Sequence, residues 1–175
     1  MSLAIDYVKN GFALVPIPLG SKGPVSPGWN LPKNAVTTVD AAANITGNMG
    51  ILHLHCKTPT TCIDLDDLEA ATKLLSDAGI DINLLLEAQD AVQISSGRPN
   101  RAKLLYRLPV NINSLETIQI EDSVNGSMVV EFRSASKGGT SVTDVLPPSI
   151  HPKTGKPYIW AGSGHWSELP ELPPV

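Results

Sequence analysis

Asp64 and Asp66 are the residues whose type and spacing most clearly indicate chemistry in this chain. In an extended strand alternate side chains point to one face, so these two carboxylates would project together while their apolar neighbours face the other way. Paired carboxylates offer the oxygen ligands that Mg²⁺ or Mn²⁺ prefers. Such a site suits phosphoryl transfer, in which metal ions offset the charge on phosphate oxygens. The alternative is a solvated strand end that runs into an acidic helix start, because further acids follow at Asp67 and Glu69.

The composition is that of a folded globular protein. The chain has 175 residues, of which 42% are hydrophobic and 17% are charged. This is enough to bury a core and too apolar for a disordered segment. Two cysteines are too few to cross-link a fold of this size, and no apolar run or secretory signal suggests a membrane or export. We therefore predict a cytoplasmic protein with reduced thiols and no membrane partner.

The distribution of charge says more than its total. A net charge of −4 does not by itself indicate a nucleic-acid partner. A run without any acid nevertheless contains Arg98, Arg101, Lys103 and Arg107. A local basic track of this kind can contact a phosphate backbone even in an acidic protein.

Apolar periodicity and turn residues predict an α+β fold with a mostly antiparallel sheet. Helices are expected over 2–10, 41–45, 67–78 and 82–88, with Ser2 and Thr38 as N-terminal caps. Strands are expected over 12–17, 49–55, 61–65, 91–95, 102–108, 128–134 and 141–146. Two hairpins are expected, one joining 49–55 to 61–65 and one over 150–160. We expect one domain over 1–165, with the tail 166–175, rich in proline and glutamate, as the start of a linker.

Strand alternation brings further charged residues to the face of Asp64. In the strand 128–134, Glu131 and Arg133 share one face. In the strand 102–108, Lys103 lies on the face opposite Leu104, Tyr106 and Leu108. If the apolar faces pack on helices, the opposite sheet face collects all of these side chains. Clustered carboxylates are costly unless a cation compensates them. An ordinary solvent-exposed sheet face with interleaved charges remains the alternative.

Several short motifs follow one another along nearly the whole chain. They are Leu14-Val15-Pro16-Ile17-Pro18, Lys22-Gly23-Pro24, Ile63-Asp64-Leu65-Asp66, Ser95-Ser96-Gly97-Arg98, Val130-Glu131-Phe132-Arg133, Leu146-Pro147-Pro148-Ser149-Ile150-His151 and Tyr158-Ile159-Trp160. In this order and spacing the chain resembles the N-terminal prim-pol domain of bifunctional DNA primase/polymerases, within the archaeo-eukaryotic primase superfamily. The fold that this resemblance implies is an RRM-like catalytic sheet with an additional N-terminal α/β unit beside it.

The resemblance also implies an activity and the residues that carry it. It implies a primase/polymerase that makes and extends primers in plasmid, phage or mobile-element replication. Its catalytic metal ligands for two Mg²⁺ or Mn²⁺ ions would be Asp64, Asp66 and Glu131. The residues that would bind nucleotide are Ser96, Arg101, Lys103, Arg133 and His151. The residues that would bind DNA are Lys22, Arg98 and Arg107.

The same resemblance implies partners and marks one departure from the family pattern. The implied partners are a single-stranded DNA template, nucleoside triphosphates and a helicase domain in the full-length protein. The family usually has a Ser-x-His motif whose histidine contacts the nucleotide phosphates. Here Ser96-Gly97-Arg98 matches its start and no histidine follows, while Lys103 or Arg101 stands on the corresponding basic strand. A lysine can hold a triphosphate as a point charge but does not reproduce imidazole geometry.

Three other interpretations stay open at this point. A primase fold that only binds DNA or replication partners would account for the departure in the Ser-x-His motif. His53-Leu54-His55 has the spacing of a HUH nickase, although no tyrosine is expected on a nearby helix. The same histidines with Cys56 and Cys62 could bind zinc, but the spacing matches no common zinc module and zinc is not expected. Tyr158 and Trp160 could stack on a base or pack in the core.

Overall fold

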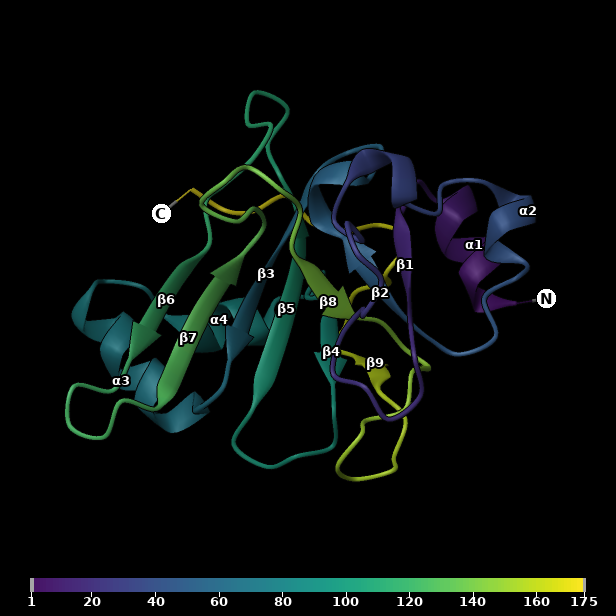
Figure 1. Cartoon of the computed structure of the whole chain (residues 1–175). Coiled ribbons are helices and arrows are strands. Elements are labelled where there is room, and N and C mark those ends of the chain that lie inside the picture. The colour runs from purple at the N-terminus through teal and green to yellow at the C-terminus, as the bar shows by residue number, and fades with distance from the viewer. Residues whose placement is uncertain (1, 175) are drawn as a thin grey trace.

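Two antiparallel sheets form the framework of the protein. The fold is taken from a computed structural model of the chain, which describes residues 2–174. A six-stranded sheet has the strand order β6-β7-β3-β5-β4-β9, and a three-stranded sheet has the order β1-β2-β8. In Figure 1 the helices α3 and α4 lie behind the larger sheet, while α1 and α2 lie beside the smaller one. The predicted α+β class is confirmed, including the extra N-terminal unit beside the main sheet.

The elements are short and are joined by many turns. The helices are α1 (Leu3–Lys9), α2 (Val39–Ala42), α3 (Leu68–Asp77) and α4 (Ile82–Glu87), with the 3₁₀ turns η1 (Pro32–Asn34) and η2 (His53–His55). The strands are β1 (Leu14–Ile17), β2 (Asn48–Leu52), β3 (Thr60–Leu65), β4 (Gln93–Ser95), β5 (Ala102–Arg107), β6 (Ile118–Glu121), β7 (Met128–Arg133), β8 (Thr143–Val145) and β9 (Ile159–Ala161). Among the described residues, no helix is long and apolar enough to cross a membrane.

The helices begin where side chains can accept the free amide hydrogens of their first turn. Asp67 accepts a hydrogen bond from the backbone N–H of Ala70 at 3.0 Å and so caps α3. Thr38 caps α2 in the same way, as the sequence predicts. Ser2 precedes α1, but its side chain makes no capping bond, so that part of the prediction is wrong. The backbone oxygen of Ser2 accepts the first helical hydrogen bond instead.

One predicted hairpin is wrong, a second is shorter than predicted, and one strand was not predicted. The segments 49–55 and 61–65 do not form a hairpin, because β2 pairs with β1 and β8 while β3 lies in the other sheet. The strand β2 ends at Leu52, and the chain crosses between the sheets through η2. The expected hairpin over 150–160 is reduced to one bridge between Ile150 and Pro157, and β9 pairs with β4. Alternation in the sequence did not reveal β6, which pairs with β7.

Two apolar clusters hold these layers together. One lies between the sheets and against α1 and α2, and the other lies between the large sheet and α3 and α4. Leu104 and Leu105, neighbours on β5, are both fully buried and belong to different clusters. Because β5 is buried on both faces, its position in the sheet is fixed from two sides. The strand that carries Lys103 is therefore a rigid support.

The segment after residue 165 makes contacts with both clusters. Trp166 packs against Tyr7 with a ring-centroid separation of 4.7 Å. The backbone N–H of Arg107 donates to the carbonyl of Pro170, and that of Leu172 donates back to Arg107, both at 2.9 Å. The tail, predicted as the start of a linker, thus contacts α1 at Trp166 and the end of β5 through residues 170–172.

Candidate active site

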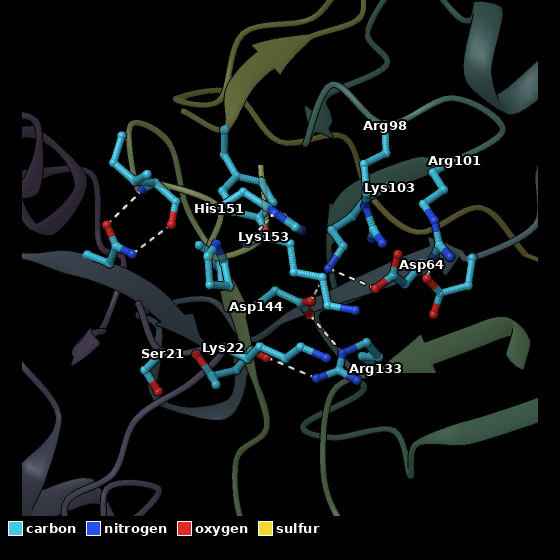
Figure 2. Close-up of a pocket in the computed structure, with 17 residues that line it drawn as sticks. Ser21, Lys22, Asp64, Arg98, Arg101, Lys103, Arg133, Asp144, His151 and Lys153 are labelled. Carbon is cyan, nitrogen blue, oxygen red and sulfur yellow. Dashed lines mark hydrogen bonds and ion pairs between the residues drawn. The ribbon is translucent and has the colours of Figure 1, made fainter. Parts of the chain in front are cut away.

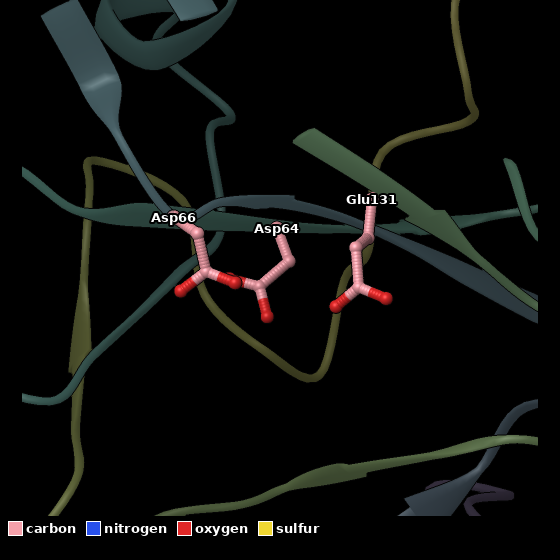
Figure 3. Close-up of side chains that lie close together, drawn as sticks. All are labelled: Asp64, Asp66 and Glu131. Atoms are coloured by element: carbon pink, nitrogen blue, oxygen red, sulfur yellow. The ribbon is translucent and has the colours of Figure 1, made fainter. Parts of the chain in front are cut away.

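The three acids singled out from the sequence lie together on one sheet face. Asp64 on β3 stands directly opposite Glu131 on β7, and Asp66 follows on the same side of the chain. Ligand oxygens of the three carboxylates lie within 4.8 Å of one another. Figure 3 shows the three side chains projecting in one direction from adjacent strands. Glu131 is 8% exposed and the two aspartates are partly buried, so this arrangement of oxygen donors fits a hard divalent cation.

Each carboxylate of this triad is paired with a basic side chain. Lys103 on β5 lies opposite Asp64, and its Nζ is 2.9 Å from the carboxylate. Arg133 donates to Glu131 at 3.0 Å. Arg101 forms an ion pair with Asp66. These pairs balance three like charges that would otherwise repel one another, and the predicted gathering of acids, Lys103 and Arg133 on one face is observed.

The second oxygen of Glu131 has a partner that the sequence did not reveal. Gln119 on β6 donates its amide hydrogen to Glu131 Oε1 at 2.5 Å. The two residues are direct neighbours across the β6–β7 ladder. With Arg133 on Oε2, both oxygens of this carboxylate are held in place. This contact could not be predicted, because β6 itself was not recognised in the sequence: Ile118 is exposed and Ile120 is only partly buried.

A further acid, Asp144 on β8, lies behind the triad and was not expected from the sequence. Its side chain is 3% exposed and accepts hydrogen bonds from His53 at 2.9 Å, from Arg133 at 3.2 Å and from Lys103. Burial alone would raise the pKa of Asp144, but Lys103 and Arg133 hold it well below its usual value. Burial would likewise lower the pKa of Lys103, but Asp144 and Asp64 raise it well above the ordinary value. Both groups are therefore charged at neutral pH.

Asp64, Asp66, Lys103, Arg133 and Asp144 line a cavity of about 460 Å³, and Glu131 lies beside Asp64 just outside its lining. The walls of the cavity carry Lys22, Arg98 and Lys153, which come from three separate loops. Figure 2 shows Lys103 bridging Asp64 and Asp144, with these cations around it. Among residues 2–174, no carboxylate lies within 4.0 Å of the charged groups of Lys22, Arg98 or Lys153. Their positive charge is therefore available to an anion.

His151 lines the same cavity and has a defined tautomer. Its Nδ1 accepts hydrogen bonds from the backbone N–H groups of Lys153 and Thr154, both at 3.2 Å. The proton of the neutral ring must therefore be on Nε2. Burial lowers the pKa of His151, and so do the neighbouring cations Arg98 and Lys153. The ring is thus a neutral hydrogen-bond donor at pH 7.

The other predicted binding residues lie partly at the cavity and partly away from it. Arg101 lines the cavity, and Ser96 lies in a smaller adjoining depression where its hydroxyl accepts a bond from Arg98 at 3.4 Å. Arg107 lies elsewhere, paired with Glu171 at 2.7 Å. The basic run of the sequence therefore does not form one continuous surface at the cavity.

The two aromatic residues near the C-terminus divide between cavity and core. Tyr158 lines the cavity and lies 5.5 Å from the ring of His151. Trp160 instead donates its indole N–H to Tyr7 at 2.7 Å and packs against Trp166. Trp160 is thus a packing residue, and Tyr158 is the one that a ligand in the cavity could contact.

The paired histidines do not have the geometry that a HUH nickase requires. They lie on the turn η2 and not on a strand, because β2 ends before them. His53 is fully buried and bonded to Asp144 and Thr60, while His55 donates to the backbone oxygen of Asn30 at 2.8 Å. The two rings therefore have separate partners. In the described part of the chain, the one group of three or more candidate metal ligands is the triad of Asp64, Asp66 and Glu131.

Comparison with known families agrees with this geometry. Residues 4–175 match the family described as bifunctional DNA primase/polymerase, N-terminal. The chain belongs to this family. Membership of the prim-pol family implies a DNA primase/polymerase function and a nucleotidyltransferase type of activity in general. No curated protein matches the sequence. In the prim-pol domain described here, the acidic triad is a group that could bind a metal ion.

Proposed function

We propose that this prim-pol domain is a metal-dependent nucleotidyltransferase that makes and extends primers on single-stranded DNA. It would join a nucleotide from a nucleoside triphosphate to a primer 3′-hydroxyl, with release of pyrophosphate. The observation that carries the proposal is the triad of carboxylates, two of which, Asp64 and Asp66, line a cavity whose other walls are basic. A nucleotidyl-transfer site needs carboxylates that bind a metal ion and positively charged side chains that bind the polyphosphate.

Asp64, Asp66 and Glu131 would hold Mg²⁺ or Mn²⁺. When bound, such ions would neutralise phosphate charge and favour the ionised form of the attacking hydroxyl. The donor set supports this assignment, because it consists only of carboxylate oxygens on rigid, adjacent strands. Gln119 and Arg133 orient Glu131 before any ligand arrives, which reduces the loss of side-chain freedom on binding.

The triphosphate would contact the cavity walls. Within residues 2–174, Lys22, Arg98 and Lys153 carry charge without a carboxylate partner, and His151 can donate from Nε2. A neutral imidazole that donates to a phosphate oxygen would take the part that the family usually gives to the histidine of its Ser-x-His motif. We therefore assign Lys22 and Arg98, first predicted as DNA contacts, to the nucleotide. Arg107 stays a predicted DNA contact outside the cavity.

The direct test is primer extension with purified protein, a primed single-stranded template and Mn²⁺. The double variant Asp64→Ala/Asp66→Ala should lower incorporation by at least about a hundredfold, because it removes the ligands of the metal. Asp77→Ala is the matched control, since this carboxylate is exposed at the end of α3 and remote from the cavity. Equal extension by wild type and the double variant would show that the triad is not catalytic.

A second candidate is a domain that binds DNA without catalysis. The observation in its favour is that every acid of the triad already has a basic partner. In that case template binding should weaken steeply with salt, because phosphate contacts release counterions, and no nucleotide should be incorporated at any Mn²⁺ concentration. The extension assay therefore separates the two candidates.

A further inference from the structure

Asp144 is the most buried acid of the site, and the proposed chemistry gives it no role. It lies on β8 of the small sheet, while the side chains that it binds come from both sides of the cavity floor. Lys103 reaches it from β5 and Arg133 reaches it from β7, and both of these strands belong to the large sheet. His53 donates to the same carboxylate from the turn η2. A buried charge with three donors is fully satisfied and fixed in position.

Lys103 and Arg133 each lie between Asp144 and one acid of the triad. Lys103 contacts Asp64 as well as Asp144. Arg133 contacts Glu131 through one nitrogen and Asp144 through another. Arg101, the partner of Asp66, has no contact with Asp144 among the described ion pairs. Two of the three basic partners of the triad thus have a second carboxylate, which lies outside the triad.

A cation that binds the triad must compete with these basic side chains. Its positive charge would repel Lys103 and Arg133 from Asp64 and Glu131. Without Asp144, Lys103 would lose its second carboxylate and Arg133 would keep only the neutral carbonyl of Thr143, so both would compete more strongly for the triad oxygens. We infer, on the basis of the function proposed above, that Asp144 is a positioning residue. It holds Lys103 and Arg133 at the cavity floor when a metal ion takes Asp64 and Glu131. The two basic side chains then remain beside the site as fixed positive charges.

The first test measures Mn²⁺ binding by electron paramagnetic resonance, without nucleotide. Asp144→Asn removes the charge with little change of shape, so Lys103 and Arg133 would be attracted more strongly to the triad and Mn²⁺ should bind about tenfold more weakly. Glu171→Gln, which alters an ion pair outside the cavity, is the control and should change nothing.

A double-mutant cycle separates positioning from a simple effect of charge. In a Lys103→Met background the loss caused by Asp144→Asn should fall to about threefold, because one of the two competing cations is already absent. An equal loss in both backgrounds would mean that Asp144 acts only through its own charge, and would overturn the inference. Circular dichroism of each variant checks that the fold is retained.

A second measurement needs no variant. Competitive acetylation of the lysines, read by mass spectrometry with and without Mg²⁺, reports how freely each amine reaches solvent. Lys103 should stay far less reactive than Lys22 and Lys153 in both conditions, because Asp144 keeps it bound. If Mg²⁺ makes Lys103 as reactive as these two cavity lysines, the inference is overturned.

Failure of this inference differs from failure of the proposed function. If wild type and Asp64→Ala/Asp66→Ala bind Mn²⁺ equally, the metal site itself is wrong and the inference is overturned with it. If wild type binds Mn²⁺ through the triad and Asp144→Asn binds it equally well, only the role of Asp144 is overturned.

Discussion

At the scale of single residues, the cavity contains two kinds of basic side chain. Lys103 and Arg133 are held by buried or half-buried carboxylates, whereas Lys22, Arg98 and Lys153 have no such partner in the part of the chain that the structure describes. A bound charge costs more to redirect than an unpaired one, since its existing ion pair must break. Lys22, Arg98 and Lys153 are therefore better placed than Lys103 and Arg133 to bind the phosphates of a substrate.

The double variant Lys22→Ala/Lys153→Ala tests this division. Loss of charge-assisted bonds to phosphate should raise the KM for nucleotide by about ten- to a hundredfold, with a smaller change in kcat. Steady-state extension at varied nucleotide concentration measures both constants. Lys73→Ala on the exposed side of α3 is the matched control. An unchanged KM in the double variant would exclude these loops from the nucleotide site.

His151 should make stability depend on pH in a defined direction. Its pKa in the folded state is lowered, so below a pH of about 6.5 the unfolded chain takes up a proton that the folded ring resists. Its contribution to the free energy of unfolding is complete above that pH and decreases as the pH falls toward the folded-state pKa. His151→Asn keeps an oxygen acceptor for the backbone of Lys153 and Thr154 but does not titrate.

We therefore expect His151→Asn to lose less stability than wild type between pH 7.5 and pH 5.5. Urea unfolding of both proteins at several pH values measures the difference. A difference that stays constant with pH would show that this ring has the same pKa in both states.

At the scale of elements, the loop of Arg98 and Arg101 is tied to the start of α3 by Asn100. The side chain of Asn100 donates to Asp67 at 2.9 Å and accepts from the backbone N–H of Glu69 at 3.0 Å. Its φ of 54° lies in the left-handed region, which asparagine adopts more readily than most residues. One residue thus links the end of β3, the helix and the loop.

Two substitutions separate the bonds of Asn100 from its backbone conformation. Asn100→Gly keeps the left-handed backbone and loses the side-chain bonds, so the free energy of unfolding should fall by about 1 kcal/mol. Asn100→Ala should lose about 1–2 kcal/mol more, because alanine is strained at this φ. Denaturant unfolding of the two variants provides the comparison, and equal values would rule out a role for the backbone conformation.

The sequence predicted the elements of the site where the pattern is local. Alternation along β3 and β7 placed Asp64, Asp66 and Glu131 correctly on one face. It could not reveal Asp144, because its partner His53 lies 91 residues away and β8 has only three residues. The hairpin error had the same origin, since nothing local shows that β2 leaves β3 for another sheet. Pairings over long distances in the chain depend on packing, which a single sequence does not display.

At the scale of the whole molecule, the last residues contribute to the core between the sheets. The ring of Trp166 contacts Tyr7, Phe12 and Trp160. Tyr7 in turn donates its hydroxyl hydrogen to the carbonyl of Pro147, next to the His151 loop. This aromatic group joins α1, β9 and the tail.

Trp166→Ala should therefore lower the free energy of unfolding by about 3 kcal/mol, through lost aromatic packing. Thermal and urea unfolding measure this loss. Leu19→Ala is a suitable comparison, because that side chain is 69% exposed and its removal should have little effect. If Trp166→Ala were as stable as wild type, the tail from residue 166 would behave as the linker that the sequence suggested.

The loop that carries His151 and Lys153 is anchored to the small sheet. Asn48 on β2 donates to the backbone oxygen of Ile150 at 2.9 Å and accepts from its N–H at 2.8 Å. Asp64 and Glu131 of the triad, in contrast, stand on the large sheet. A nucleotide held as proposed would contact residues supported by both sheets and would link the two sheets. Asp144 already joins the two sheets through Lys103 and Arg133, so a bound substrate would add a second connection between them across the cavity.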